Sequence, residues 1–132
     1  MFSVTVADHT MIAHSFRGAV FGPAQRMHGA TYVVEAEMRG NALDDDGILV
    51  DIGAARALLR QVLSTLDYRN LDEEPAFRGR NTTTEALARH LHELLAQHCR
   101  EGALGPGGRR LASLRMTLRE SPAAWAAYEG AI

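Results

Sequence analysis

The stretch Ala30-Thr-Tyr-Val-Val-Glu-Ala-Glu-Met-Arg39 alternates apolar and polar side chains, and this alternation predicts a β-strand. The apolar face of this strand consists of Tyr32, Val34, Ala36 and Met38. The other face is mainly polar and carries Thr31, Val33, Glu35, Glu37 and Arg39. Because only one face is apolar, we expect a sheet with one buried side and one wet side, which is typical of antiparallel sheets.

Other segments of the chain are expected to extend this sheet. Phe2–Val6 alternates in the same way and continues through Thr10–Ile12, and Ser113–Arg119 is a further alternating strand. Trp125–Tyr128 fits either a short strand or a helical turn, and Ile48–Val50 fits a short strand end. Between the first two strands, residues 15–27 contain glycines and a proline without periodicity, which predicts a long loop.

Two amphipathic helices are expected after the second strand. Apolar residues recur at helical spacing over Ile52–Leu66, and Asp51 is the expected N-cap. A polar connection follows, and Thr82-Thr-Thr-Glu85 is a capping-box pattern that predicts the start of the second helix. Residues 102–108 form a glycine-rich connection to the next strand. The resulting order predicts an α+β fold in which a four-stranded antiparallel sheet carries two helices on one face.

Composition restricts the class of protein. The 132 residues are 46% hydrophobic and 23% charged, which predicts one folded domain over residues 1–132. The net charge is -2 and every basic side chain is Arg, so we expect no nucleic-acid partner and no lysine chemistry. Cys99 is the only cysteine, no apolar run reaches the length of a membrane span, and no signal peptide is evident. We therefore expect a cytoplasmic protein without a membrane partner.

Three groups of residues could support chemistry. His14 and His28 come from strand ends and could form half of a zinc site. Asp67 and Tyr68 place a carboxylate beside a phenol, which could support proton transfer. Glu120 follows an alternating strand, and its carboxylate could bind the planar edge of an amidine-like ligand. For each group the residues alone leave a plainer alternative open. The histidines could simply be hydrogen-bonded near a loop, and Asp67 and Tyr68 could belong to a C-terminal helix turn that hydrogen-bonds its own backbone. Glu120 could be a solvated charge at a strand end.

Taken in order, these segments resemble the 6-pyruvoyl-tetrahydropterin synthase and 6-carboxytetrahydropterin synthase family, which has the tunnelling fold. The resemblance rests on six short segments spread over nearly the whole chain. They are Ala13-His14, His28-Gly-Ala-Thr-Tyr32, Gly47-Ile-Leu-Val-Asp51-Ile52, Leu66-Asp-Tyr-Arg-Asn-Leu-Asp72, Asn81-Thr-Thr-Thr-Glu85, and Glu120 with the later Tyr128.

The resemblance implies roles for individual residues and also departures from the family pattern. Two of the three zinc-binding histidines of the family map to His14 and His28, but the third position is Ala30. The catalytic Cys position is Ala24, and the catalytic His position is Tyr68. The pterin-binding Glu maps to Glu120. Thr83 and Arg26 complete the expected substrate-binding set, and Tyr68, Asp67 and His28 form the expected catalytic set.

The resemblance also implies an assembly, in which trimers close their sheets into a β-barrel and two trimers stack into a hexamer. Active sites then lie between subunits. We expect a divergent lyase that acts on the side chain of a pterin- or purine-like substrate, with an incomplete zinc site and no organic cofactor. Two alternatives stay open: a non-catalytic module that binds such a ring, and a tunnelling-fold enzyme with a different substrate and a rebuilt site.

Overall fold

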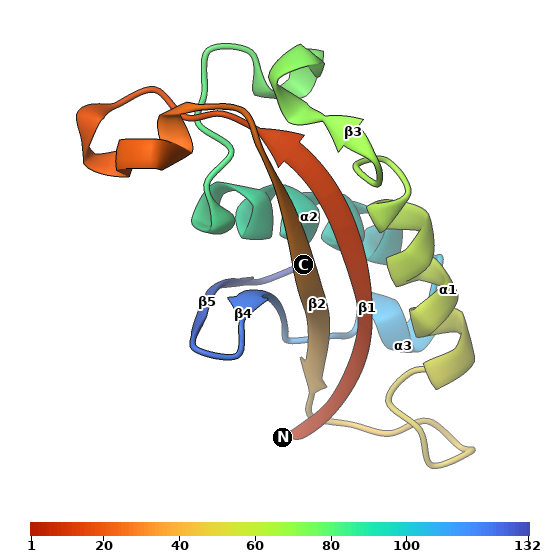
Figure 1. Ribbon diagram of the computed structural model, residues 1–132. Helices are drawn as coiled ribbons and strands as arrows, with labels where there is room; N and C mark the ends of the chain where they lie inside the picture. The colour runs from red at the N-terminus through yellow and green to blue at the C-terminus, as the bar shows by residue number, and fades with distance from the viewer.

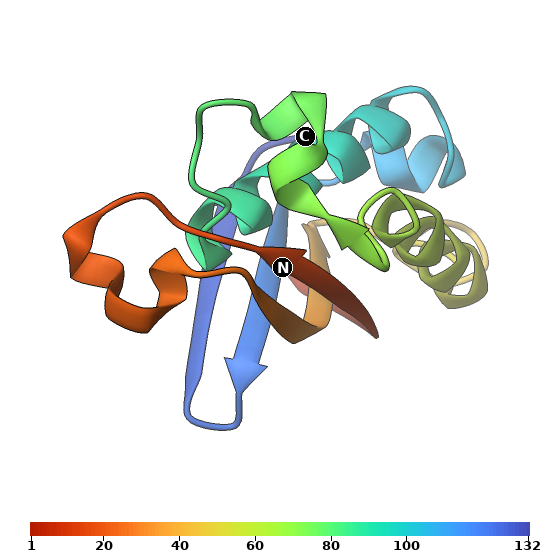
Figure 2. The ribbon, with the colours of Figure 1, turned by 45° about the horizontal axis from the view of Figure 1, so that its top comes forward.

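Strands β1 (Phe2–His14) and β2 (His28–Gly40) form a long antiparallel pair in the computed structural model, which describes residues 1–132 (Figure 1). Their register runs from Phe2 opposite Gly40 to His14 opposite His28, so both imidazoles belong to the same end of the pair. The connection between them contains a short 3-10 helix, η1 (Ala19–Gln25), where only a loop was expected. Figures 1 and 2 show η1 projecting beyond the end of the sheet.

The sheet has five strands in the order β3-β1-β2-β4-β5. Strands β4 (Ser113–Ser121) and β5 (Ala124–Gly130) continue the antiparallel part, so Trp125–Tyr128 belongs to a strand. The fifth strand, β3 (Arg69–Asn70), is parallel to β1, so the expectation of a four-stranded, purely antiparallel sheet was wrong. The sheet is open within this subunit, because the outer side of β1 before Ile12 and the outer side of β5 have no neighbouring strand.

The sharp turn at Tyr68 explains the unexpected parallel strand. Tyr68 has a φ of 59°, which is rare for a residue with a side chain. Its N–H donates to the carbonyl of Met11 at 2.7 Å, and the Met11 N–H donates to the carboxylate of Asp67 at 3.0 Å. These two bonds hold the chain against β1 just before Arg69 and Asn70 pair with it.

Helices α1 (Ile52–Leu63) and α2 (Thr84–Arg100) pack on one face of the sheet, and a short helix, α3 (Gly105–Arg109), follows in the expected glycine-rich connection (Figures 1 and 2). Asp51 caps α1 as predicted, since its carboxylate accepts from the N–H of Gly53 at 2.8 Å. Residue Thr83 caps α2, one position later than the capping-box pattern indicated. The short strand end expected at Ile48–Val50 did not form: Ile48 has no regular structure, and Leu49 and Val50 lie in bends before α1.

The period-two pattern of the strands assigns each side chain to a face. Even-numbered residues of β1, β2 and β4 face the helices and form most of the sheet's share of the core, as in the buried row Tyr32, Val34, Ala36 and Met38. Odd-numbered residues form a polar face without helices. There Arg119 pairs with Glu35 at 2.7 Å and its guanidinium lies 4.5 Å from the centre of the Trp125 ring. No helix in the structure has both the length and the apolar character needed to span a bilayer.

Candidate functional site

A cleft of about 440 Å³ lies on the helix-facing side of the sheet, at the end where β1 stops and β2 starts. The strand periodicity explains its composition, because His14, His28, Ala30, Tyr32 and Glu120 all occupy even-numbered positions. The complete lining is His14, Phe16, Ala24, His28, Gly29, Ala30, Thr31, Tyr32 and Glu120. Three of the residues that the sequence singled out therefore lie in one cavity: His14, His28 and Glu120.

The two imidazoles of the cleft are held close together. Their ring centres are 4.6 Å apart, and Phe16 packs against His14 at 4.5 Å and against His28 at 5.5 Å. The Nδ1 atom of His28 lies 2.8 Å from the carbonyl oxygen of Arg26. A carbonyl only accepts, so Nδ1 of His28 carries a hydrogen, and in the corresponding neutral tautomer Nε2 is the atom with the lone pair.

His14 is anchored by the segment that precedes α2. Its Nδ1 lies 2.9 Å from the hydroxyl oxygen of Thr82, and both side chains are buried. Burial lowers the pKa of His14, and the nearby His28 lowers this pKa further. We therefore expect His14 to be neutral at pH 7, with a fixed ring orientation.

Glu120 provides an acidic group at the far wall of the cleft. The hydroxyl of Thr84, in the first turn of α2, donates to Oε1 of Glu120, and Oε2 has no hydrogen-bond partner in the protein. Nearby Tyr32 is buried, and burial raises the pKa of its phenol, so this group stays protonated. The cleft thus offers a carboxylate oxygen that accepts, beside an ordered hydroxyl and two imidazoles.

The donors in the cleft fall short of a typical catalytic zinc site. Such a site takes three protein ligands plus water, and here the two histidines have no third partner. Ala30 shares the face of His28 two residues further along β2, but its methyl group offers no lone pair. No group of three histidine, cysteine or acidic side chains is arranged to hold a metal anywhere in the structure. The residues present therefore do not fit the zinc centre that the resemblance implied.

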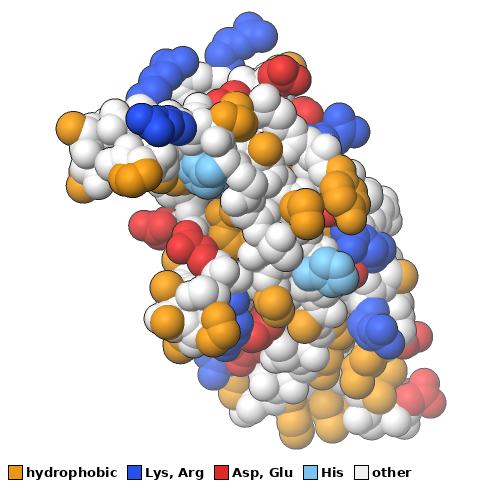
Figure 3. Space-filling model, in the orientation of Figure 1, with side chains coloured by type: hydrophobic (Ala, Val, Ile, Leu, Met, Phe, Trp, Pro, Cys, Tyr) orange, Lys and Arg blue, Asp and Glu red, His pale blue; other side chains and the backbone are white.

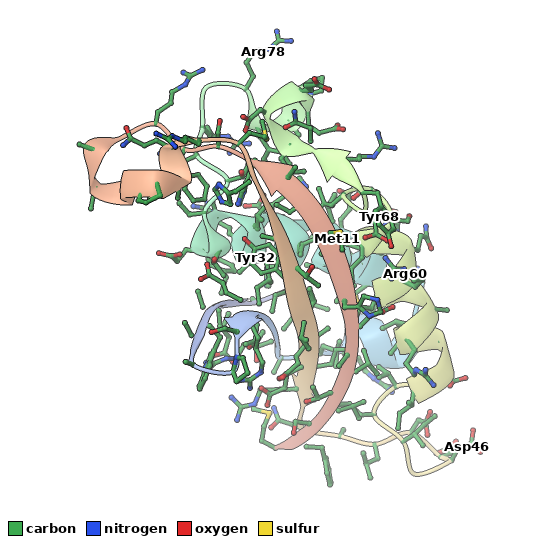
Figure 4. The ribbon with its side chains drawn as sticks, in the orientation of Figure 1. Met11, Tyr32, Asp46, Arg60, Tyr68 and Arg78 are labelled. Atoms are coloured by element: carbon green, nitrogen blue, oxygen red, sulfur yellow. The ribbon has the colours of Figure 1, made fainter.

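Asp67 and Tyr68 lie outside this cleft. Figure 4 shows Tyr68 beside Met11 and Arg60, on the outer side of β1 and apart from Tyr32. The carboxylate of Asp67 accepts from the hydroxyl of Thr10 at 3.0 Å and pairs with Arg60 at 3.3 Å, in addition to its bond with Met11. Tyr68 is 81% exposed at this edge of the sheet. The structure therefore separates this pair from the cleft of its own subunit.

Thr83 and Arg26 lie near the cleft without lining it. The Thr83 hydroxyl accepts from the N–H of Ala86 at the start of α2, and its side chain borders a neighbouring cavity of about 620 Å³. Arg26 is exposed, and its contribution to the cleft is the backbone carbonyl that orients His28.

Sequence reasoning missed two residues of the site, Thr82 and Thr84. These threonines flank Thr83, and their hydroxyls bind His14 and Glu120 respectively. The run of three threonines before a predicted helix was the available signal. The pattern predicts a helix cap and the resemblance singles out Thr83, but a helix start can also direct the neighbouring hydroxyls toward the strands.

Comparison with known proteins places this fold among the solved 6-pyruvoyl tetrahydropterin synthases. The structure of the *Caenorhabditis elegans* 6-pyruvoyl tetrahydropterin synthase matches with a TM-score of 0.81 at 23% identity, covering 98% of this chain and 96% of that one. The *Plasmodium vivax* 6-pyruvoyl tetrahydropterin synthase matches over 100% of both chains, with a TM-score of 0.77 at 17% identity. At these identities the likeness establishes the fold.

Sequence comparison establishes the family. Residues 3–131 match the 6-pyruvoyl tetrahydropterin synthase family, and the chain therefore belongs to it. The 6-carboxy-5,6,7,8-tetrahydropterin synthase of *Bacillus subtilis* is 25% identical over 131 residues, covering 96% of this chain and 84% of that protein. The 6-pyruvoyl tetrahydrobiopterin synthase of *Dictyostelium discoideum* is 32% identical over 71 residues, covering 52% of this chain. That match spans about half the length of the *Dictyostelium* relative, namely 53%.

Proposed function

We propose that this protein binds a pterin- or purine-like ring in the Glu120 cleft and catalyses a lyase step on the side chain of that ring. The observation that carries the proposal is the carboxylate of Glu120, which is held by Thr84 and lines one cleft with two histidines. Membership of the pterin synthase family and the names of its relatives support the choice of ligand.

The chemistry of the ring explains how Glu120 would recognise it. A pterin or guanine edge presents neighbouring N–H donors in one plane, and a carboxylate accepts two such bonds. Oε2 of Glu120 is available for this purpose, while Oε1 already accepts from Thr84. The volume of about 440 Å³ falls within the range of small-molecule pockets, about 300–1,000 Å³.

The proposed reaction needs a base beside the side chain of the bound ring and an acid for the leaving group. The free Nε2 of His28 is suited to take a proton from a hydroxyl or an activated carbon, since Nδ1 is fixed on the carbonyl of Arg26. Cleavage of a carbon–oxygen or carbon–carbon bond then releases a group that must receive a proton. We assign that proton to Tyr68 of the partner subunit, with Asp67 holding the turn that carries it.

The open sheet supports a site that is shared between subunits. The outer side of β1 before Ile12 and the outer side of β5 are free edges, and free edges are prone to pair with another chain. We propose that they pair in a trimer-based ring, with a hexamer as the complete assembly. Such pairing would bring the exposed Tyr68 of one subunit close to a second chain. Light scattering that gave the mass of one chain at micromolar concentration would contradict this assembly and the shared site.

Ligand binding is the direct test of the Glu120 role. We expect calorimetric titration to detect binding of pterin and guanine, and much weaker binding of adenine, whose edge presents a different donor pattern. Glu120→Gln should weaken pterin binding by about 1.5–3 kcal/mol, the range for hydrogen bonds to a charged group. Glu129→Gln, on the neighbouring strand and the opposite face, is the matched control and should bind like the wild type. Unchanged affinity in the Glu120 variant would remove Glu120 as the anchor.

A second candidate function is a binding module without catalysis. Ala24 and Ala30 both line the cleft, and the resemblance assigns these positions to the catalytic Cys and to a metal ligand. A wall of methyl groups there keeps the shape of a ring pocket and removes two reactive groups. Binding that depends on Glu120, with no consumption of pterins carrying different side chains, would favour the module over the lyase.

A further inference from the structure

One part of the Glu120 cleft is apolar, unlike the wall that carries the carboxylate. Phe16, Ala24 and Ala30 line this part, and each of these side chains is half-buried. The resemblance places a catalytic Cys and a metal ligand at the two alanine positions, so methyl groups stand where reactive groups were expected. We call Phe16, Ala24 and Ala30 the apolar subsite. Figure 3 shows hydrophobic and histidine side chains together where η1 meets the sheet.

The phenyl wall of the apolar subsite is held in place by the surrounding backbone. The N–H and the carbonyl of Arg17 both bond to the side-chain amide of Asn81, each at 2.9 Å. The N–H of Phe16 donates to the carbonyl of Ala24 at 3.1 Å, which joins two members of the subsite. The Phe16 ring also packs against Phe21 of η1, with 4.7 Å between the ring centres. The subsite is thus formed in the free protein, and binding there requires little further ordering.

Strand β2 sets the distance between Glu120 and the apolar subsite. The pairing of β2 with β4 places Glu120 beside Tyr32, one step beyond the paired residues. Ala30 lies two residues further along β2 and His28 four residues further, which is about 7 Å and 13 Å at the usual rise of a strand. A bicyclic ring whose edge meets Glu120 would cover the first of these distances. Its substituent would then reach the apolar subsite beside His28.

The side chains around that position favour hydrocarbon over hydroxyl groups. Phe16, Ala24 and Ala30 offer a phenyl ring and two methyl groups, and only the imidazoles of His14 and His28 add polar atoms on this side of the sheet. A hydroxyl group that is buried against methyl and phenyl groups loses its hydrogen bonds with water, which is unfavourable. A substituent with several hydroxyl groups therefore fits this part of the cleft less well than an alkyl group of the same length.

We propose that the apolar subsite determines substrate specificity, and that the ring bound at Glu120 carries an alkyl or aryl substituent that packs against Phe16, Ala24 and Ala30. This inference rests on the proposed ring binding and narrows the class of substrate. One polar atom of the substituent next to His28 agrees with the proposed proton transfer. The remainder of the substituent is hydrocarbon.

Two pterins with side chains of equal length test this specificity. The side chain of 6-propylpterin is a saturated three-carbon chain, and biopterin carries the same chain with two hydroxyl groups. In calorimetric titration of the wild-type chain, we expect 6-propylpterin to bind on the order of tenfold more tightly than unsubstituted pterin, because its alkyl group is removed from water. Biopterin should bind no more tightly than pterin.

Two variants connect this preference to the apolar subsite. Ala30→Ser adds a hydroxyl group with a small change in volume, and Phe16→Ser removes the phenyl wall. Each variant should reduce the advantage of 6-propylpterin over biopterin to about threefold or less, with pterin as the reference ligand. Val20→Ser is the matched control and should keep the full preference, because Val20 belongs to the same connection, is 89% exposed and lies outside the cleft. If Phe16→Ser proves unstable in thermal unfolding, Ala30→Ser provides the comparison.

The outcomes separate this inference from the proposed ring binding. If pterin binds through Glu120 but biopterin binds as tightly as 6-propylpterin, ring binding stands and the apolar subsite is refuted. A preference for 6-propylpterin that is unchanged in both Ala30→Ser and Phe16→Ser would also overturn the inference, since another surface would then contact the alkyl group. If none of the three pterins binds, the proposed ring binding fails and this inference fails with it.

Discussion

Replacing Asp67 by Asn tests whether this carboxylate holds the turn at Tyr68 against β1. The wild-type carboxylate accepts from the Met11 N–H and from the Thr10 hydroxyl, each at 3.0 Å, and pairs with Arg60 at 3.3 Å. Asparagine keeps one oxygen of nearly the same position, so one bond to the backbone can persist. The substitution removes the negative charge and turns charge-assisted bonds into neutral ones.

The magnitude follows from these contacts. A hydrogen bond to a charged group is worth about 1 kcal/mol more than a neutral one, and a partly exposed ion pair adds about 0.2–1 kcal/mol. We therefore expect Asp67→Asn to lower the free energy of unfolding by about 1–2 kcal/mol at pH 7. Asp45→Asn is the matched control, because the Asp45 side chain has no partner in the protein, and it should have almost no effect.

The pH dependence gives the sharper test. The hydrogen bond from Met11 is the main cause that lowers the pKa of Asp67 below its ordinary value of 3.8. The unfolded chain therefore binds the proton first as the pH falls. The stabilisation is complete above the unfolded pKa and is lost as the pH falls through the lower folded pKa.

Urea unfolding at fixed protein concentration, repeated from pH 7 to pH 2.5, measures this difference. We expect the difference in the free energy of unfolding between the wild type and Asp67→Asn to be constant above about pH 5. Below pH 4 this difference should become smaller. A gap of the same size at every pH would refute the role of the charge. No gap at pH 7 would refute the role of the carboxylate as the anchor of the turn.

Three further predictions concern the cleft and the turn. Ala30→His places an imidazole two residues from His28 on the same face, and we expect zinc affinity, measured by competition with a chelator, to rise on the order of tenfold or more. Tyr68→Gly should raise the free energy of unfolding by about 0.5–1 kcal/mol in urea titration, since φ of 59° costs a tyrosine more than a glycine. Because the pKa of His14 is lower in the folded protein than in the unfolded chain, stability should fall as the pH drops below the unfolded value of 6.5. The melting temperature of His14→Gln should lack this His14-dependent decrease at low pH.

Much of the fold could be predicted from local patterns. The alternation over Ala30–Arg39 identified both the strand and its buried face, because a period of two assigns side chains without any tertiary information. Asp51 was predictable as a cap for the same reason, since capping depends on neighbouring residues only. The parallel strand β3 could not be predicted, because it is two residues long and depends on bonds between Asp67, Tyr68 and a strand more than fifty residues earlier.

The grouping of the candidate site was predictable only in part. His14, His28 and Glu120 lie at strand ends and are all even-numbered, so their side chains share one face of the sheet. Strand pairing then brings them to one cavity. The side of β1 on which Asp67 and Tyr68 lie depends on how the chain leaves α1, which no local pattern encodes. The roles of the cleft residues and of Asp67 and Tyr68 in binding and catalysis stay predictions. The pterin titration of Glu120→Gln tests the binding role of Glu120.

The two histidines of the cleft owe their positions to hydrogen bonds with the surrounding chain. Thr82 fixes His14, and the Arg26 carbonyl fixes His28, so neither ring relies on a bound ion for its orientation. An alanine at position 30 is therefore compatible with an intact cavity around it. A scaffold of this kind allows the reactive groups of a pocket to change one at a time while the pocket keeps its shape. The same property makes this chain a suitable starting point for installing new ligands at positions 24 and 30.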